Sequence, residues 1–100
     1  MGVLSGIIKE ERDRLESLIQ LYDKRLASLP KGSIRIKGAY AYLKRREGSS
    51  TPTSYLGRVD DEKVQKIREQ LKERQMYQER RKKAMLELME VRRALRAMAA

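Results

Sequence analysis

Aromatic and then basic residues occupy alternate positions of the segment 40–46, and their types and spacing suit the binding of a polyanion. If residues 47–50 form a hairpin loop, Tyr42 lies opposite Tyr55. Alternate residues of a strand face the same side, so Tyr40, Tyr42, Lys44 and Arg46 share one face. Cations contact phosphates and flat rings stack on unpaired bases. This face is therefore predicted to bind nucleic acid.

Further basic residues lie on the other parity of these strands or at their edges, and they extend the candidate site. The predicted nucleic-acid-binding set is Arg35, Lys37, Tyr40, Tyr42, Lys44, Arg45, Arg46, Tyr55 and Arg58. Under an alternative interpretation, the tyrosines pack against helices while the basic residues only keep a small sheet in solution. The sequence leaves both orientations of the tyrosines open.

The distribution of charge favours the binding interpretation. The chain has 100 residues and a formal net charge of +10. Residues 31–58 carry seven positive side chains and one negative side chain, whereas residues 1–30 carry five of each. A local excess of positive charge raises the local concentration of polyanions. We therefore expect a polyanionic partner to bind at the middle of the chain.

Catalysis has few candidate residues, because the chain has no histidine and no cysteine. A general base or nucleophile would have to come from carboxylates, lysine, serine or tyrosine, and these form no recognisable set. The acidic run 60–62 could hold a hard cation, although capping of a helix N-terminus explains it better. We expect a protein that is not an enzyme and has no metal site and no cofactor.

A second basic patch occurs in the run Arg80, Arg81, Lys82 and Lys83. Most such runs are solvated faces of helices. Together with the apolar residues that follow, up to residue 98, the run also resembles an amphipathic helix that lies on an anionic membrane. No apolar run approaches the roughly 20 residues of a membrane span. We expect no membrane span and a cytoplasmic location.

Two amphipathic helices must position these residues. Apolar residues at spacings of three and four predict a helix over 4–29, with Ser5 as its N-cap and Pro30 ending it. A second helix is predicted over 60–98, beginning at the acidic run. Its apolar pattern weakens across residues 74–83 and then resumes. The final stretch resembles a coiled-coil seam.

Between the helices, residues 33–59 alternate in the manner of three short antiparallel strands. Lys37 and Gly38 could form a tight turn, and residues 47–50 supply the small polar residues of a longer hairpin loop. The predicted fold class is α+β and mostly α. In it, two long antiparallel, coiled-coil-like amphipathic helices are connected by a small β-meander within one domain, residues 1–100.

The second helix is predicted to be longer than the first, so an antiparallel pairing leaves part of it overhanging. A chain of this length buries a thin core, and self-association would help it. We expect a homodimer formed through the C-terminal seam, or alternatively a break near Gln78 that folds the segment back onto the first helix. The predicted oligomerisation residues are Leu88, Val91, Leu95 and Met98.

Four short motifs, at residues 29–34, 40–43, 46–48 and 55–57, carry a resemblance to known sequences. They read LPKGSI, YAYL, REG and YLG. With the helical flanks, they resemble an uncharacterised group of short prokaryotic proteins with the same helix, sheet, helix layout. That group has no established activity, so the resemblance implies the architecture alone.

Two weaker likenesses concern the fold. The order of strands and helix looks like the arm-binding domains of tyrosine-recombinase integrases, which would make Arg35, Lys37, Lys44 and Arg46 the groove-facing residues. Prefoldin-like subunits also join two coiled-coil helices through β-hairpins, which would make the sheet an assembly platform. The favoured function is an oligomeric module that binds nucleic acid through its phosphate backbone. The alternative is a protein-interaction or assembly scaffold.

Overall fold

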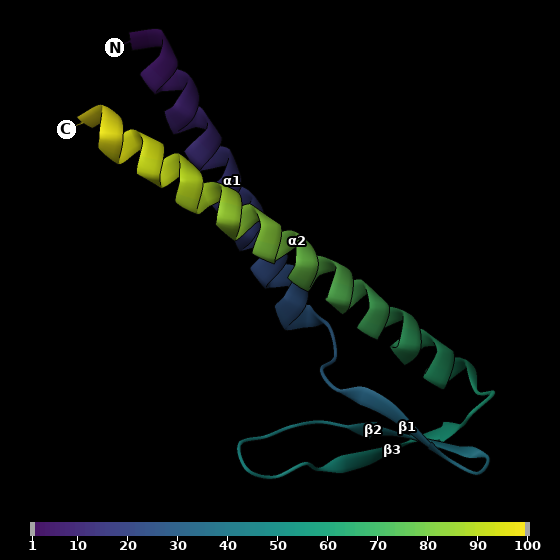
Figure 1. Cartoon of the computed structure of the whole chain (residues 1–100). Helices are drawn as coiled ribbons and strands as arrows, with labels where there is room; N and C mark the ends of the chain where they lie inside the picture. Colours follow the sequence, from purple (N-terminus) through teal and green to yellow (C-terminus); the bar gives the residue numbers. More distant parts are fainter. Residues whose placement is uncertain (1, 100) are drawn as a thin grey trace. The chain divides into compact units, whose positions relative to one another are not determined.

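A computed structural model describes residues 2–99 of the chain. The elements run in the order α1 (Gly2–Ser28), β1 (Ser33–Lys37), β2 (Tyr40–Lys44), β3 (Thr53–Arg58) and α2 (Glu62–Ala99) (Figure 1). The predicted fold class is confirmed: two helices flank a three-stranded antiparallel sheet in the order β1-β2-β3. Within residues 2–99, neither helix combines the length and the apolar character that crossing a membrane requires.

The chain divides into two compact units. The helical unit contains α1 up to Ala27 and α2 from Tyr77 onward. The sheet unit, Ser28–Met76, contains the three strands and the first part of α2. The helix α2 continues through both units without the break that was one alternative near Gln78.

The core of the helical unit lies between α1 and the C-terminal part of α2, which run antiparallel (Figure 1). Leu15 and Ile19 of α1 are buried with Ala84 and Leu88 of α2. In each helix the two buried residues are four apart, so each pair lies on one face. Burying a leucine side chain contributes about 1.5–3 kcal/mol relative to exposing it, so this small cluster stabilises the pairing of the two helices.

Two of the four residues predicted to form the dimer seam, Leu88 and Val91, pack in or against this core. Leu88 is only 3% exposed, and Val91 packs against the same cluster, whereas Leu95 and Met98 are half-buried. The first two side chains of the seam therefore pack inside the chain. The physical reason is that α1 supplies the apolar face that α2 needs, so no second chain is required to cover Leu88 and Val91.

The ends of α1 differ from the prediction at one terminus only. The helix begins at Gly2, so Ser5 lies inside it and is not the N-cap. It ends at Ser28, two residues before Pro30, as expected from the geometry that proline disfavours in the residue before it. The carbonyl of Leu29 accepts a hydrogen bond of 3.2 Å from Nη1 of Arg74, so it keeps a partner beyond the last turn of the helix.

The N-terminus of α2 is capped by Asp61. A side-chain oxygen of Asp61 accepts a hydrogen bond of 3.1 Å from the backbone N–H of Lys63, and its carbonyl accepts bonds from the N–H groups of Val64 and Gln65. The helix therefore begins at Glu62 rather than at residue 60. The prediction that this acidic run starts a helix is confirmed, with Asp61 in the capping role.

Two tight turns connect the strands. Gly38 and Ala39 join β1 to β2, one position later than predicted, and Gly48 and Ser49 join the β2 and β3 arms. Both glycines have φ near +60°, and neither Ala39 nor Ser49 has a positive φ, which is the pattern of a type II′ turn. The Glu47 and Ser50 backbones exchange hydrogen bonds of 2.9 and 3.0 Å, which confirms the predicted hairpin loop.

Gly32 is required where the chain enters the sheet. Its φ is +121°, and a Cβ atom there would lie 2.5 Å from the carbonyl oxygen of Lys44. An L side chain would therefore meet both an unfavourable backbone conformation and a backbone atom that cannot move freely.

We expect Gly32→Ala to lower the free energy of unfolding by about 1–3 kcal/mol, measured by urea denaturation. The matched control is Gly6→Ala within α1, where a Cβ atom would meet nothing within 4 Å. Because alanine favours a helix, this control should raise the free energy of unfolding by about 0.5–1 kcal/mol. Equal effects of the two substitutions would contradict the steric requirement at Gly32.

Candidate nucleic-acid interface

One face of the sheet carries three rows of cross-strand neighbours, and we call it the tyrosine face. Residues that pair directly across antiparallel strands point to the same side. The pairing of β1 with β2 and of β2 with β3 aligns nine residues, three from each strand. The rows are Lys37, Tyr40 and Arg58; then Arg35, Tyr42 and Tyr55; then Ser33, Lys44 and Thr53.

The predicted pairing of Tyr42 with Tyr55 is confirmed, and Arg35, Lys37 and Arg58 lie on the edge strands β1 and β3 but share the face of the tyrosines. These three residues were expected on the other parity or at edges. The turn at Gly38 pairs Lys37 with Tyr40 and Arg35 with Tyr42, so both cations join the tyrosine face. The site therefore gathers more positive charge on one side than the sequence indicated.

A bulge in β3 brings Arg58 to this face. The register shifts between Ala41 and Tyr42, so Tyr40 pairs with Arg58 whereas Tyr42 pairs with Tyr55. The extra β3 residue between the two pairings lets Tyr55 and Arg58, three positions apart, face the same side. A glycine follows the extra residue, with φ of +144°; such a glycine inside a strand was the one sequence signal that could have indicated the bulge.

The three tyrosines lie on the side opposite the buried residues Ala41 and Leu43 of β2. Tyr55 is 58% exposed and Tyr40 is 45% exposed, whereas Tyr42 is half-buried. Their rings contact one another, with centroids 6.1 Å apart for Tyr40 and Tyr55 and 5.5 Å apart for Tyr42 and Tyr55. The alternative in which these tyrosines pack against helices is therefore not adopted.

The charges of the tyrosine face all have one sign. Its nine positions contain four cations and no carboxylate. Among residues 2–99, no ion pair joins Arg35, Lys37 or Lys44 to an acidic side chain. Arg58 lies 4.0 Å from Asp60, but both groups are well exposed, and such a pair contributes little. The face therefore presents cations that are available to an anionic ligand.

The remaining two predicted cations lie just beyond β2. Arg45 and Arg46 are both exposed, and the Arg45 guanidinium lies 3.7 Å from Glu47. The backbone N–H of Arg45 donates to the carbonyl of Pro52 at 3.0 Å, so the hairpin continues past the last residue of β2. A surface hollow borders the tyrosine face and does not include Arg45 or Arg46; it is lined by Ile34, Arg35, Ile36, Lys37, Tyr42, Lys44, Thr51, Thr53 and Tyr55.

The second basic patch does not form one surface. Consecutive helical residues point about 100° apart, so Arg80 to Lys83 spread around α2. Arg80 and Lys83 line one hollow of the helical unit, and Arg81 and Lys82 line another. Nε of Arg81 also donates a 2.6 Å hydrogen bond to Asp23 of α1. This ion pair gives Arg81 a partner within the helical unit.

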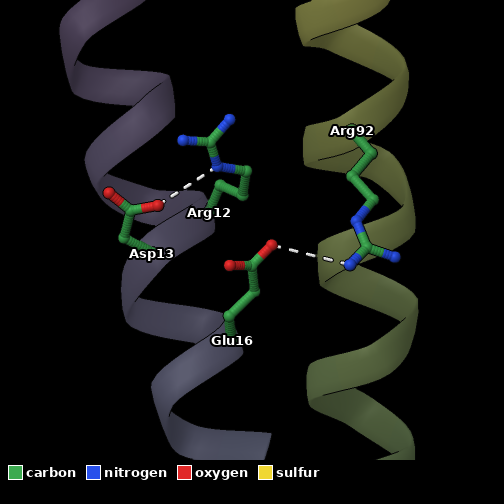
Figure 2. A network of polar contacts seen from close by, with 4 residues as sticks. All are labelled: Arg12, Asp13, Glu16 and Arg92. Carbon is green, nitrogen blue, oxygen red and sulfur yellow. Dashed lines mark hydrogen bonds and ion pairs between the residues drawn. The ribbon is translucent and has the colours of Figure 1, made fainter.

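Several other charges of the helical unit form local pairs. Figure 2 shows Arg12 beside Asp13 at 3.1 Å, and Glu16 of α1 reaching Arg92 of α2 at 3.5 Å.

Arg14 and Glu11 lie three residues apart on α1. Arg14 donates two hydrogen bonds to Glu11, and these bonds lower the pKa of the Glu11 carboxyl below its ordinary value. Part of the positive charge in this unit is thus offset by nearby carboxylates. The tyrosine face differs, because no carboxylate is present on its nine positions.

The acidic run 60–62 is used structurally, since Asp61 caps α2 and Asp60 lies beside Arg58. Within the part of the chain that the structure describes, no three acidic side chains converge as a metal site would require. No protein-family model, curated protein or solved structure matches the chain. The resemblances suggested by its short motifs stay predictions, and the functional inference depends on the tyrosine face itself.

Proposed function

We propose that this protein is a non-enzymatic binding module that contacts the phosphate backbone of nucleic acid through the tyrosine face. The observation that carries the proposal is the composition of that face, with four cations, three tyrosines and no carboxylate on nine adjoining positions. Phosphate contacts of this kind do not depend on base sequence. The proposal therefore concerns affinity for the backbone and not recognition of a particular sequence.

The physical basis is the release of counterions. Each phosphate that a lysine or arginine neutralises frees condensed cations, so affinity falls as salt concentration rises. The three rows of the tyrosine face extend over roughly 13 Å along the strands, because alternate residues of a strand are about 6.6–6.8 Å apart. Four cations within that distance can contact several successive phosphates of one strand.

We expect saturable binding of labelled oligonucleotides, measured by fluorescence anisotropy. With four phosphate contacts, affinity should fall roughly 50- to 150-fold between about 50 and 200 mM salt. The triple variant Arg35→Gln, Lys37→Gln and Lys44→Gln should weaken binding at low salt and lower the magnitude of the salt slope by about 2–3.

The matched control is the triple variant Arg80→Gln, Lys82→Gln and Lys83→Gln, which removes the same number of positive charges from the helical unit. It should keep most of the affinity and most of the salt slope. If both triple variants lose affinity equally, net charge alone explains the binding and the assignment to the tyrosine face is wrong. If the parent protein binds neither DNA nor RNA at low salt, the proposed function is wrong.

A second candidate function is an assembly scaffold, and a specific observation favours it. Val3, Leu4 and Ile7 of α1 are 81%, 64% and 56% exposed, and their spacing places them on one face of the helix. Isolated apolar residues on a surface are common, but an apolar stripe marks a candidate interaction surface. This stripe, rather than Leu88 and Val91, is then the place where a second chain would bind.

We expect Leu4→Glu with Ile7→Glu to shift the protein toward monomer in sedimentation velocity experiments if the stripe mediates self-association. Buried glutamates would have to lose their hydration at such an interface, which is costly. The control is Leu21→Glu, which alters another exposed apolar residue of α1 outside the stripe. A parent protein that sediments as a monomer at all concentrations would rule out self-association through this stripe.

A further inference from the structure

We propose that the nucleic acid on the tyrosine face is single-stranded, with unpaired bases stacked on the rings of Tyr40 and Tyr55. The inference depends on the proposed function and specifies its ligand. It starts from the exposure of these two rings, since a binding surface that used phosphates alone would gain nothing specific from aromatic side chains at its centre. Stacking on aromatic rings tolerates any base, because every base has a π face.

The distance between the two rings argues against a paired duplex. The Tyr40 and Tyr55 centroids are 6.1 Å apart and their planes are inclined by 55°. Bases within a duplex follow one another at about 3.4 Å along the axis and are covered on both sides by their neighbours. Two successive bases can each stack on one of these rings only if they leave such a regular stack. A flexible single strand allows that separation, whereas an intact duplex does not.

Tyr42 holds the Tyr55 ring in place. The two rings meet edge to face, with centroids 5.5 Å apart and planes inclined by 62°. Tyr42 is half-buried, so it is the more restrained member of the pair. Restraining Tyr55 before binding reduces the entropy that is lost when a ligand orders its ring. Tyr42 therefore acts as a positioning residue, and Tyr40 and Tyr55 act as the stacking residues.

The cations of the face stand where the phosphates of such a strand would pass. Lys37 and Arg58 lie on either side of Tyr40 in its row, and Arg35 lies beside Tyr42 in the next row. Their long side chains can reach backbone oxygens while the bases cover the rings. Rings in the middle and cations around them are the arrangement that binds a single strand by its bases and its backbone together.

The test uses three ligands of equal length, about 12 nucleotides: an oligothymidylate, an abasic strand with the same phosphates, and a duplex. The protein is the variant Tyr22→Phe with Tyr77→Phe. These two rings pack together in the helical unit with centroids 5.9 Å apart, and phenylalanine keeps that packing. Because the chain has no tryptophan and five tyrosines, its remaining intrinsic fluorescence then comes from Tyr40, Tyr42 and Tyr55 alone.

We expect oligothymidylate to quench this fluorescence and to bind at least roughly thirtyfold more tightly than the abasic strand, since each of the two stacked bases strengthens binding. Adding Tyr40→Leu and Tyr55→Leu should remove that advantage, so that this variant binds oligothymidylate and the abasic strand with equal affinity. The conservative pair Tyr40→Phe and Tyr55→Phe should keep the advantage. Unchanged far-UV circular dichroism and an unchanged urea denaturation curve show that the leucine variant remains folded.

Equal affinity for oligothymidylate and the abasic strand in the parent protein would overturn base stacking while leaving phosphate binding intact. Tighter binding of the duplex than of oligothymidylate would overturn the single-stranded ligand. If none of the three ligands binds at about 50 mM salt, the proposed function itself fails. The two proposals therefore fail by different results.

Discussion

The register of β2 against its two neighbours is the constraint on which the tyrosine face depends. A slip of one residue would turn every side chain of a strand to the opposite side, exposing Ala41 and Leu43 and burying the tyrosines. The II′ turns fix the register at both hairpins, and the bulge in β3 adjusts it once more, between the Tyr42 pair and the Tyr40 pair. Small backbone features thus decide whether four cations and three rings share one surface.

The helical unit and the tyrosine face differ in how their cations are paired. In the helical unit, several cations have acidic neighbours: Asp23 binds Arg81, Glu16 binds Arg92 and Glu11 binds Arg14. Each exposed pair contributes little to stability, and residues 77–99 still carry seven cations against three carboxylates. The tyrosine face has no carboxylate on its nine positions. The pairing of the strands therefore brings four cations together on one surface that has no carboxylate among its positions.

Local patterns predicted much of the fold. The spacing of apolar residues and the position of Pro30 predicted α1, and the acidic run predicted the start of α2. A hairpin loop at residues 47–50 correctly predicted the pairing of Tyr42 with Tyr55. Features that depend on tertiary context were missed. The only sequence signal of the bulge in β3 is the glycine at position 57. Likewise, periodicity shows that Leu88 needs an apolar partner but cannot show whether that partner belongs to the same chain.

The sheet has two unpaired edges, at β1 and β3, and such edges are the usual starting points of aggregation. Side chains and backbone features of these two strands protect both edges. The β1 edge carries Arg35 and Lys37, so two copies brought edge to edge would repel each other. The β3 edge is interrupted by its bulge and follows Pro52, which has no N–H to donate. The side chains that suit a polyanion thus also oppose the growth of intermolecular β-structure.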